Sequence, residues 1–136
     1  MILWVVVGFG IALLCAFLLH LLSIKQYPFW RVGLVIAALI YVGFALFGQN
    51  WEWLPIELLG VLIYGVFFWL SKYISPYFIA AGWALHVLWD IFLHPGGHPG
   101  YVPTWYPPIC LGFDLFMAIY LVYLIRQFQK TSTSTK

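Results

Sequence analysis

Histidine and aspartate recur at the spacing of a helical turn within an otherwise apolar stretch of this chain. His86, Asp90 and His94 stand four residues apart in the segment GWALHVLWDIFLHP, and Asp114 stands in a later apolar stretch. Because a helix has about 3.6 residues per turn, the three side chains of the first stretch fall on one helical face. Carboxylates and imidazoles together suit zinc, manganese or iron. The pattern therefore predicts a divalent metal site.

The expected depth of the two carboxylates strengthens this prediction. Asp90 and Asp114 each lie about five residues from the predicted outer end of their stretch, roughly 7 Å below the interface at about 1.5 Å per residue. Two close carboxylates in a low dielectric must share a proton, pair with a cation or hold a metal. The candidate ligands are His86, Asp90, His94 and Asp114. On a straight helix His86 and His94 are about 12 Å apart, so one ion is not expected to bind both.

Two further ionisable residues lie near the same predicted end. His98 belongs to the loop PGGHPGYVPTWYPP, which could cover the site as a lid, and Glu57 begins another apolar stretch. Asp90, Asp114 and His98 are the candidate catalytic residues, with His98 or a free carboxylate as general base. The alternatives stay open: His98 as an exposed loop histidine, Glu57 as a group that favours a helix N-terminus, and the Asp/His cluster as hydrogen bonds that tie helices together.

The composition indicates which elements position these residues. Of the 136 residues, 65% are hydrophobic and 7% charged, far below the roughly 25% charged residues of a soluble domain. Apolar stretches near the length that crosses a bilayer recur along the chain. They predict an all-α membrane protein, a bundle of five transmembrane helices at about 2–23, 32–47, 55–74, 76–94 and 109–128. The first stretch lacks the basic start of a cleaved signal peptide, so we expect it to be retained.

The charges predict the orientation of this bundle. The cations occupy alternate gaps between apolar stretches, and the other gaps hold Glu52 and His98 but no Lys or Arg. Positive charge marks the cytoplasmic side of a membrane protein. The N-terminus is therefore predicted outside and the C-terminus in the cytoplasm. The cations are Lys25, Arg31, Lys72, Arg126, Lys130 and Lys136.

One transmembrane domain, residues 1–128, and a polar cytoplasmic tail, residues 129–136, account for the whole sequence. Scattered cations without a basic patch argue against nucleic acid as a partner. The expected partners are membrane lipids, with a homo-oligomer or a larger membrane complex as further possibilities. The expected location is the cytoplasmic membrane of a bacterium or archaeon.

Residues 82–119 resemble an uncharacterised family of small bacterial and archaeal integral membrane proteins. That family shares a Trp–x–x–His–x–x–x–Asp core, a Pro-Thr loop and a later Cys–x–x–x–Asp. It often has two adjacent histidines where this chain has Leu93-His94. The resemblance implies a location for the site but no reaction. It is carried by Gly82, Trp83, Leu85, His86, Trp89, Asp90, His94, Gly97, Pro99, Val102, Pro103, Thr104, Cys110, Asp114, Ala118 and Ile119.

Two functions compete at this point. The first is a metal-dependent membrane enzyme, a hydrolase or lipid-modifying enzyme, acting on a lipid-like substrate near the outer leaflet; intramembrane zinc hydrolases of the alkaline ceramidase type offer an analogy. The second is a non-enzymatic protein, either an accessory subunit or a proton or ion pathway. Haem ligation is disfavoured because His20 and His86 are expected at different depths.

Overall fold

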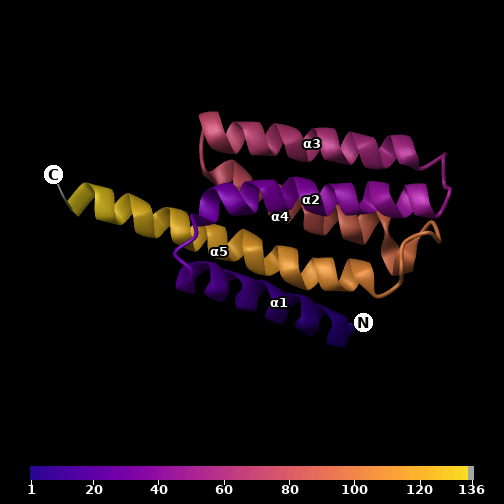
Figure 1. Ribbon diagram of the computed structural model, residues 1–136, viewed down its shortest axis with the longest axis horizontal. Coiled ribbons are helices and arrows are strands. Elements are labelled where there is room, and N and C mark those ends of the chain that lie inside the picture. The colour runs from indigo at the N-terminus through magenta and orange to yellow at the C-terminus, as the bar shows by residue number, and fades with distance from the viewer. Residues whose placement is uncertain (135–136) are drawn as a thin grey trace.

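The computed structural model describes residues 1–134, with side chains placed through residue 130, and these residues form an all-helical bundle (Figure 1). The helices are α1 (Ile2–Leu21), α2 (Gln26–Phe47), α3 (Leu54–Tyr73), α4 (Tyr77–Leu93), a short 3-10 helix at Pro95–Gly97, and α5 (Tyr106–Ser134). No strand occurs within residues 1–134. The predicted all-α architecture of five helices is confirmed.

Four of the five helices, α1, α2, α3 and α5, are long and apolar enough to span a membrane. The fourth helix, α4, is equally apolar in character but has 17 residues. At about 1.5 Å per residue it is roughly 26 Å long, slightly less than a hydrocarbon core of about 30 Å. The helix that carries most of the candidate site is therefore the shortest one.

Consecutive helices run in opposite directions, so each connection lies at one end of the bundle or the other (Figure 1). The main packing pairs are α1 with α5, α4 with α5, α2 with α3, and α3 with α4, whereas α1 barely touches α2. The bundle is consequently only loosely filled where α2 faces α1 and α5, and the cavities described below lie beside α2.

Glycine allows the closest helix pair to form. A Cβ on Gly8 of α1 would lie 1.9 Å from the carbonyl oxygen of Ile109, and a Cβ on Gly112 of α5 would lie 2.0 Å from that of Val5. Small residues let helix backbones approach each other in this way, which is a common mode of packing in membranes. Two glycines, one on each helix, thus fix α1 against α5.

Three of the cations lie at one end of the bundle. Arg31 joins α2 to the end of α3, because its Nε donates to Ser71 Oγ at 3.0 Å and its Nη2 donates to the Ser71 carbonyl oxygen at 2.8 Å. Lys25 and Lys72 lie at the same end of the bundle, in or beside the connections α1–α2 and α3–α4. The connections α2–α3 and α4–α5 lie at the opposite end (Figure 1). The arrangement agrees with the charge pattern that predicts the orientation, which itself stays a prediction.

Three predicted boundaries differ from the structure. The second helix begins at Gln26 rather than near residue 32, because Pro28 is tolerated in a first helical turn. The fifth begins at Tyr106 rather than near residue 109, for the same reason at Pro107 and Pro108. The predicted polar tail continues α5 as far as Ser134, while residues 135–136 lie outside the described residues.

The connection between α4 and α5 folds back onto the helices. It contains the 3-10 turn, and Val102 within it is buried with 3% exposure. Gly97 has a φ of 87°, and a Cβ there would lie 2.5 Å from the carbonyl oxygen of Val102. The loop therefore closes the end of the bundle opposite the cations, which is predicted to face outside and is called the outer end below, instead of lying free on the surface.

Candidate metal centre

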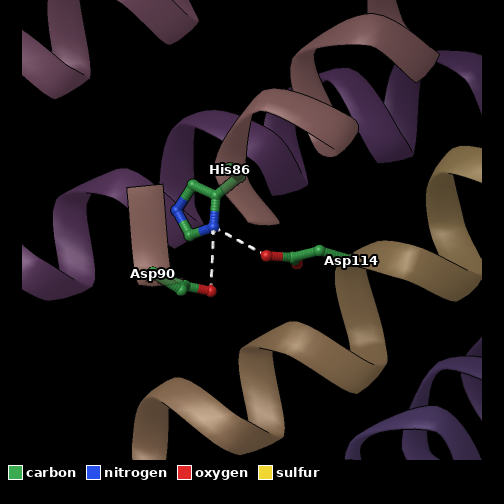
Figure 2. A group of neighbouring side chains, drawn as sticks. All are labelled: His86, Asp90 and Asp114. Carbon is green, nitrogen blue, oxygen red and sulfur yellow. Dashed lines mark hydrogen bonds and ion pairs between the residues drawn. The ribbon is translucent and has the colours of Figure 1, made fainter. Parts of the chain in front are cut away.

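Three candidate ligands meet inside the bundle, His86 and Asp90 from α4 and Asp114 from α5 (Figure 2). The Nδ1 of His86 lies 2.7 Å from Asp114 Oδ2 and 3.7 Å from Asp90 Oδ2. One ligand atom from each residue lies within 4.8 Å of those of the other two. The side chains are almost completely buried, with residue exposures of 0%, 3% and 1%. The group can hold one divalent cation.

Helix geometry explains the meeting. His86 and Asp90 are one turn apart on α4, and α4 packs closely on α5. Asp114 is eight residues into α5, about 12 Å from its start, because that helix begins earlier than expected. Asp90 is three residues from the end of α4, about 5 Å. Measured from the helix ends, both distances differ from the roughly 7 Å on which the expected depths rest, although the two carboxylates do reach the same level.

Two tyrosines that sequence reasoning missed complete this group. Tyr41 of α2 donates its hydroxyl to Asp90 Oδ1 at 2.5 Å, and the Tyr64 ring of α3 lies 5.0 Å from the His86 ring. Both tyrosines are fully buried. Their positions in the sequence could have identified them. Membrane proteins usually place tyrosines in an interfacial belt, and these two lie in the middle of apolar stretches. Each of the four helices α2 to α5 thus contributes to the site.

The group carries a net negative charge unless it binds a metal ion or additional protons. Two carboxylates face one imidazole, and the Lys and Arg residues in the described part of the chain lie towards the other end of the bundle. A buried charge is stable only when it is paired. A neutral imidazole with two carboxylates and a divalent metal would be neutral, and so would an imidazolium with one carboxylate and one carboxylic acid. The group must hold either a metal ion or additional protons.

Several buried polar atoms around the group have no hydrogen-bond partner within the described side chains. They include His86 Nε2, Asp90 Oδ2 and the Tyr64 hydroxyl. Leaving such an atom unsatisfied costs about 1–3 kcal/mol. Ligands of a tetrahedral zinc ion lie about 3.3 Å apart, given bonds of about 2.0–2.1 Å. The 2.7 Å contact between His86 and Asp114 is a hydrogen bond, so an ion would require the two groups to separate slightly.

His94 belongs to a different group, nearer the outer end. Its Nδ1 donates to the carbonyl oxygen of His98 at 2.9 Å, and its Nε2 lies 3.2 Å from Glu57 Oε1 without a well-aligned hydrogen bond. Tyr101 donates its hydroxyl to the same Glu57 oxygen. The structure therefore does not bring His94 to the three residues above, in keeping with the distance expected along α4.

The two groups touch through one side chain. The Tyr41 ring stacks on the His94 ring, with centroids 4.3 Å apart and planes 15° apart, while its hydroxyl binds Asp90. Tyr41 thus lies between the inner group of His86, Asp90 and Asp114 and the outer group of Glu57, His94 and Tyr101.

The remaining sequence candidates occupy other places. The His98 side chain is exposed and packs against the Trp53 ring at 5.3 Å, so it contributes only its backbone carbonyl to the outer group. Its predicted role as a lid ligand or general base has no geometric support. Glu57, considered as a helix N-terminal acid or a residue at the mouth of the site, is buried in the outer group with 1% exposure. His20 lies at the opposite end of the bundle.

An apolar cavity of about 370 Å³ reaches Asp114 from the space between α2 and α5. Its walls include Trp30, Ile36, Ile40 and Phe113, and Asp114 is its one acidic residue. Ile36 and Ile40 are 50% and 38% exposed on the outside of the bundle, where lipid would lie. The cavity is therefore suited to an apolar chain that approaches Asp114 sideways.

Comparison with known proteins gives no match: no protein-family model, curated protein or solved structure is significantly similar to this chain. The resemblance of residues 82–119 to the small membrane-protein family consequently stays a prediction, and function has to be argued from the site itself.

Proposed function

We propose that this protein is a metal-dependent integral membrane enzyme that acts on a lipid-like substrate. The observation that carries the proposal is the buried group of His86, Asp90 and Asp114, whose ligand atoms lie within 4.8 Å of one another. Two acids and one imidazole form a donor set suited to zinc, manganese or iron. Ionisable residues inside a membrane bundle are costly, and they usually mark functional sites.

The protein side chains would divide the work at such a site. A bound divalent ion would supply an activated water or polarise a carbonyl oxygen. Tyr41 holds Oδ1 of Asp90, and Oδ2, which has no hydrogen-bond partner among the described side chains, would be available to hold the ion. Full burial of His86 and near-complete burial of Asp114 exclude bulk water, which strengthens every electrostatic interaction at the site.

A lipid-like substrate follows from the access route. The cavity beside Asp114 is lined almost entirely by apolar and aromatic side chains, which suits an acyl or isoprenoid chain better than a polar metabolite. Asp114 lies about 12 Å from the start of α5, in the half of the bundle nearer the predicted outer leaflet. Cleavage or modification of the lipid near its ester or amide group would fit this depth.

The deciding experiment measures metal content on protein purified in detergent without added chelator. We expect about one zinc, manganese or iron per chain, and loss of that metal in Asp90→Asn, Asp114→Asn and His86→Gln. His98→Ala is the matched control, because His98 is an exposed histidine of the adjoining loop. The metal-loaded protein should then release product from ester- or amide-linked lipids, and Asp114→Asn should not.

A specific observation favours a second function. The 2.7 Å hydrogen bond from His86 to Asp114 and the 2.5 Å bond from Tyr41 to Asp90 connect α2, α4 and α5 without any ion. If the folded protein contains no metal at neutral pH, these bonds define a helix-tying network in a non-enzymatic membrane protein. That outcome would overturn the metal-dependent enzyme.

A further inference from the structure

A second and larger cavity lies at the end of the bundle that carries the cations. Its volume is about 1170 Å³, and it is formed by the ends of α1 and α5, the start of α2 and Pro76. The polar side chains in its wall are His20, Ser23, Lys25, Gln26, Tyr27 and Arg31, with Gln129 from α5. Apolar walls from Leu19 and Ile125, both buried, complete it.

The charge of this cavity is of one sign. Lys25 and Arg31 line it, and none of the described residues in its wall is acidic. The acids of the chain are Glu52, Glu57, Asp90 and Asp114, all in the half of the bundle nearer the opposite end. Arg31 is held in place by its two hydrogen bonds to Ser71, so its guanidinium is fixed before any ligand arrives. A fixed guanidinium beside the ammonium of an exposed lysine is suited to a phosphate group.

An apolar groove continues from this cavity along the outside of α2. It has a volume of about 470 Å³ and shares Ile24, Lys25 and Pro28 with the cavity. Beyond them it is lined by Phe29, Val32 and Ile36, which are 45%, 50% and 50% exposed. A ligand that fills both would have an anionic head and an apolar tail parallel to the helix.

We infer that this end of the bundle binds the headgroup of an anionic phospholipid from the cytoplasmic leaflet, with one acyl chain along α2. Basic pockets between transmembrane helices on the cytoplasmic side recognise such headgroups. The polar wall alone would also admit free phosphate, but the continuous apolar groove has a use only if the ligand carries a tail. The polar headgroup pocket is separate from the metal centre and does not depend on a bound metal, although the apolar groove shares Phe29, Gly33 and Ile36 with the cavity beside Asp114.

Native mass spectrometry of the full-length protein in detergent tests this site. The protein is titrated with phosphatidylglycerol, with phosphatidylcholine of the same chains and with inorganic phosphate. We expect phosphatidylglycerol to bind several-fold more tightly than phosphatidylcholine. Lys25→Gln should weaken its binding about fivefold, the effect of one basic residue near an anionic lipid. Lys72→Gln is the matched control, because Lys72 lies at the same end but outside the cavity, over the Tyr73 ring.

Several results would overturn the inference. Equal binding of the two lipids would remove the headgroup site. An equal loss in Lys25→Gln and Lys72→Gln would reduce the effect to general surface charge. If inorganic phosphate binds as tightly as phosphatidylglycerol, the cavity is a site for anions in general and not for a lipid. Arg31 is not replaced, because its removal would also break its two hydrogen bonds to Ser71. The second variant in the cavity wall is therefore His20→Gln, and its thermal midpoint should match that of the unmodified protein.

Discussion

Tyr41 is the residue on which both buried polar groups depend. Its hydroxyl donates to Asp90 and its ring stacks on His94, so it fixes one carboxylate of the inner group and one imidazole of the outer group. Hydrogen-bonding partners behind a metal ligand orient that ligand and tune the site. A tyrosine in this position therefore has a positioning role whether the inner group holds a metal ion or only protons.

Replacing Tyr41 with phenylalanine should separate the two cases. Leaving a buried Asp90 oxygen without its donor should lower the free energy of unfolding by about 1–3 kcal/mol. If an ion is bound, its affinity should also fall by about 10–100-fold. Thermal unfolding in detergent and a competition titration with a chelator measure the two effects. Tyr123→Phe, at a tyrosine that is 56% exposed on α5, should change neither, and an equal response of both variants would refute the role of Tyr41.

Tyr101 in the α4–α5 loop predicts a pH dependence. Burial, and then the hydrogen bond to Glu57, raise the pKa of its phenol above the usual value of 10.0. Because the pKa is raised on folding, the stabilisation is fully present below the unfolded pKa and is lost as pH rises through the folded pKa. Between pH 10 and about 11 the unmodified protein should lose more stability than Tyr101→Phe. Thermal midpoints over that range test this, and parallel curves would contradict it.

At the scale of the helices, the least expected feature is how α1 is held. It contacts mainly α5, and the contact depends on backbone approaches at Gly8 and Gly112. Gly8→Ala places a Cβ 1.9 Å from a carbonyl oxygen, whereas a Cβ at Gly10 on the same helix meets nothing within 4 Å. Overpacking of this kind costs about 1–3 kcal/mol. Gly8→Ala should therefore lower the thermal midpoint and expose Cys15 of α1 to thiol reagents, and Gly10→Ala should do neither.

Sequence predicted the elements better than their mutual contacts. Hydrophobic length and charge were enough for five helices, because the bilayer permits little else in long apolar stretches. The i, i+4 spacing placed His86 beside Asp90, and the order of the two stretches in the chain, joined by one long loop, indicated that α4 lies beside α5. The periodicity could not show that Tyr41 and Tyr64 point inward, or that Glu57 joins His94. Those contacts depend on the rotation of α2 and α3 about their axes, which is decided by packing between distant residues.

At the scale of the whole molecule, the two proposed sites lie at opposite ends of the bundle. The outer end carries the carboxylates and buried histidines, and the other end carries the cations and the large cavity. Both the metal-dependent enzyme and the phospholipid site assume the same orientation, in which the cationic end faces the cytoplasm. If the orientation is reversed, each of the two proposed sites lies in the other leaflet of the membrane.

The orientation can be measured directly with single cysteines in a background of Cys15→Ser and Cys110→Ser. Gln49→Cys lies in the α2–α3 connection and Ser75→Cys in the α3–α4 connection, at opposite ends of the bundle. Positive charge beside Ser75, from Lys72, predicts that this connection stays in the cytoplasm. A membrane-impermeant thiol reagent added to intact cells should therefore label Gln49→Cys and leave Ser75→Cys unmodified until the membrane is opened. The reverse pattern would place the metal centre towards the cytoplasmic leaflet. The basic cavity would then face the outer leaflet, against the rule that positive charge marks the cytoplasmic side.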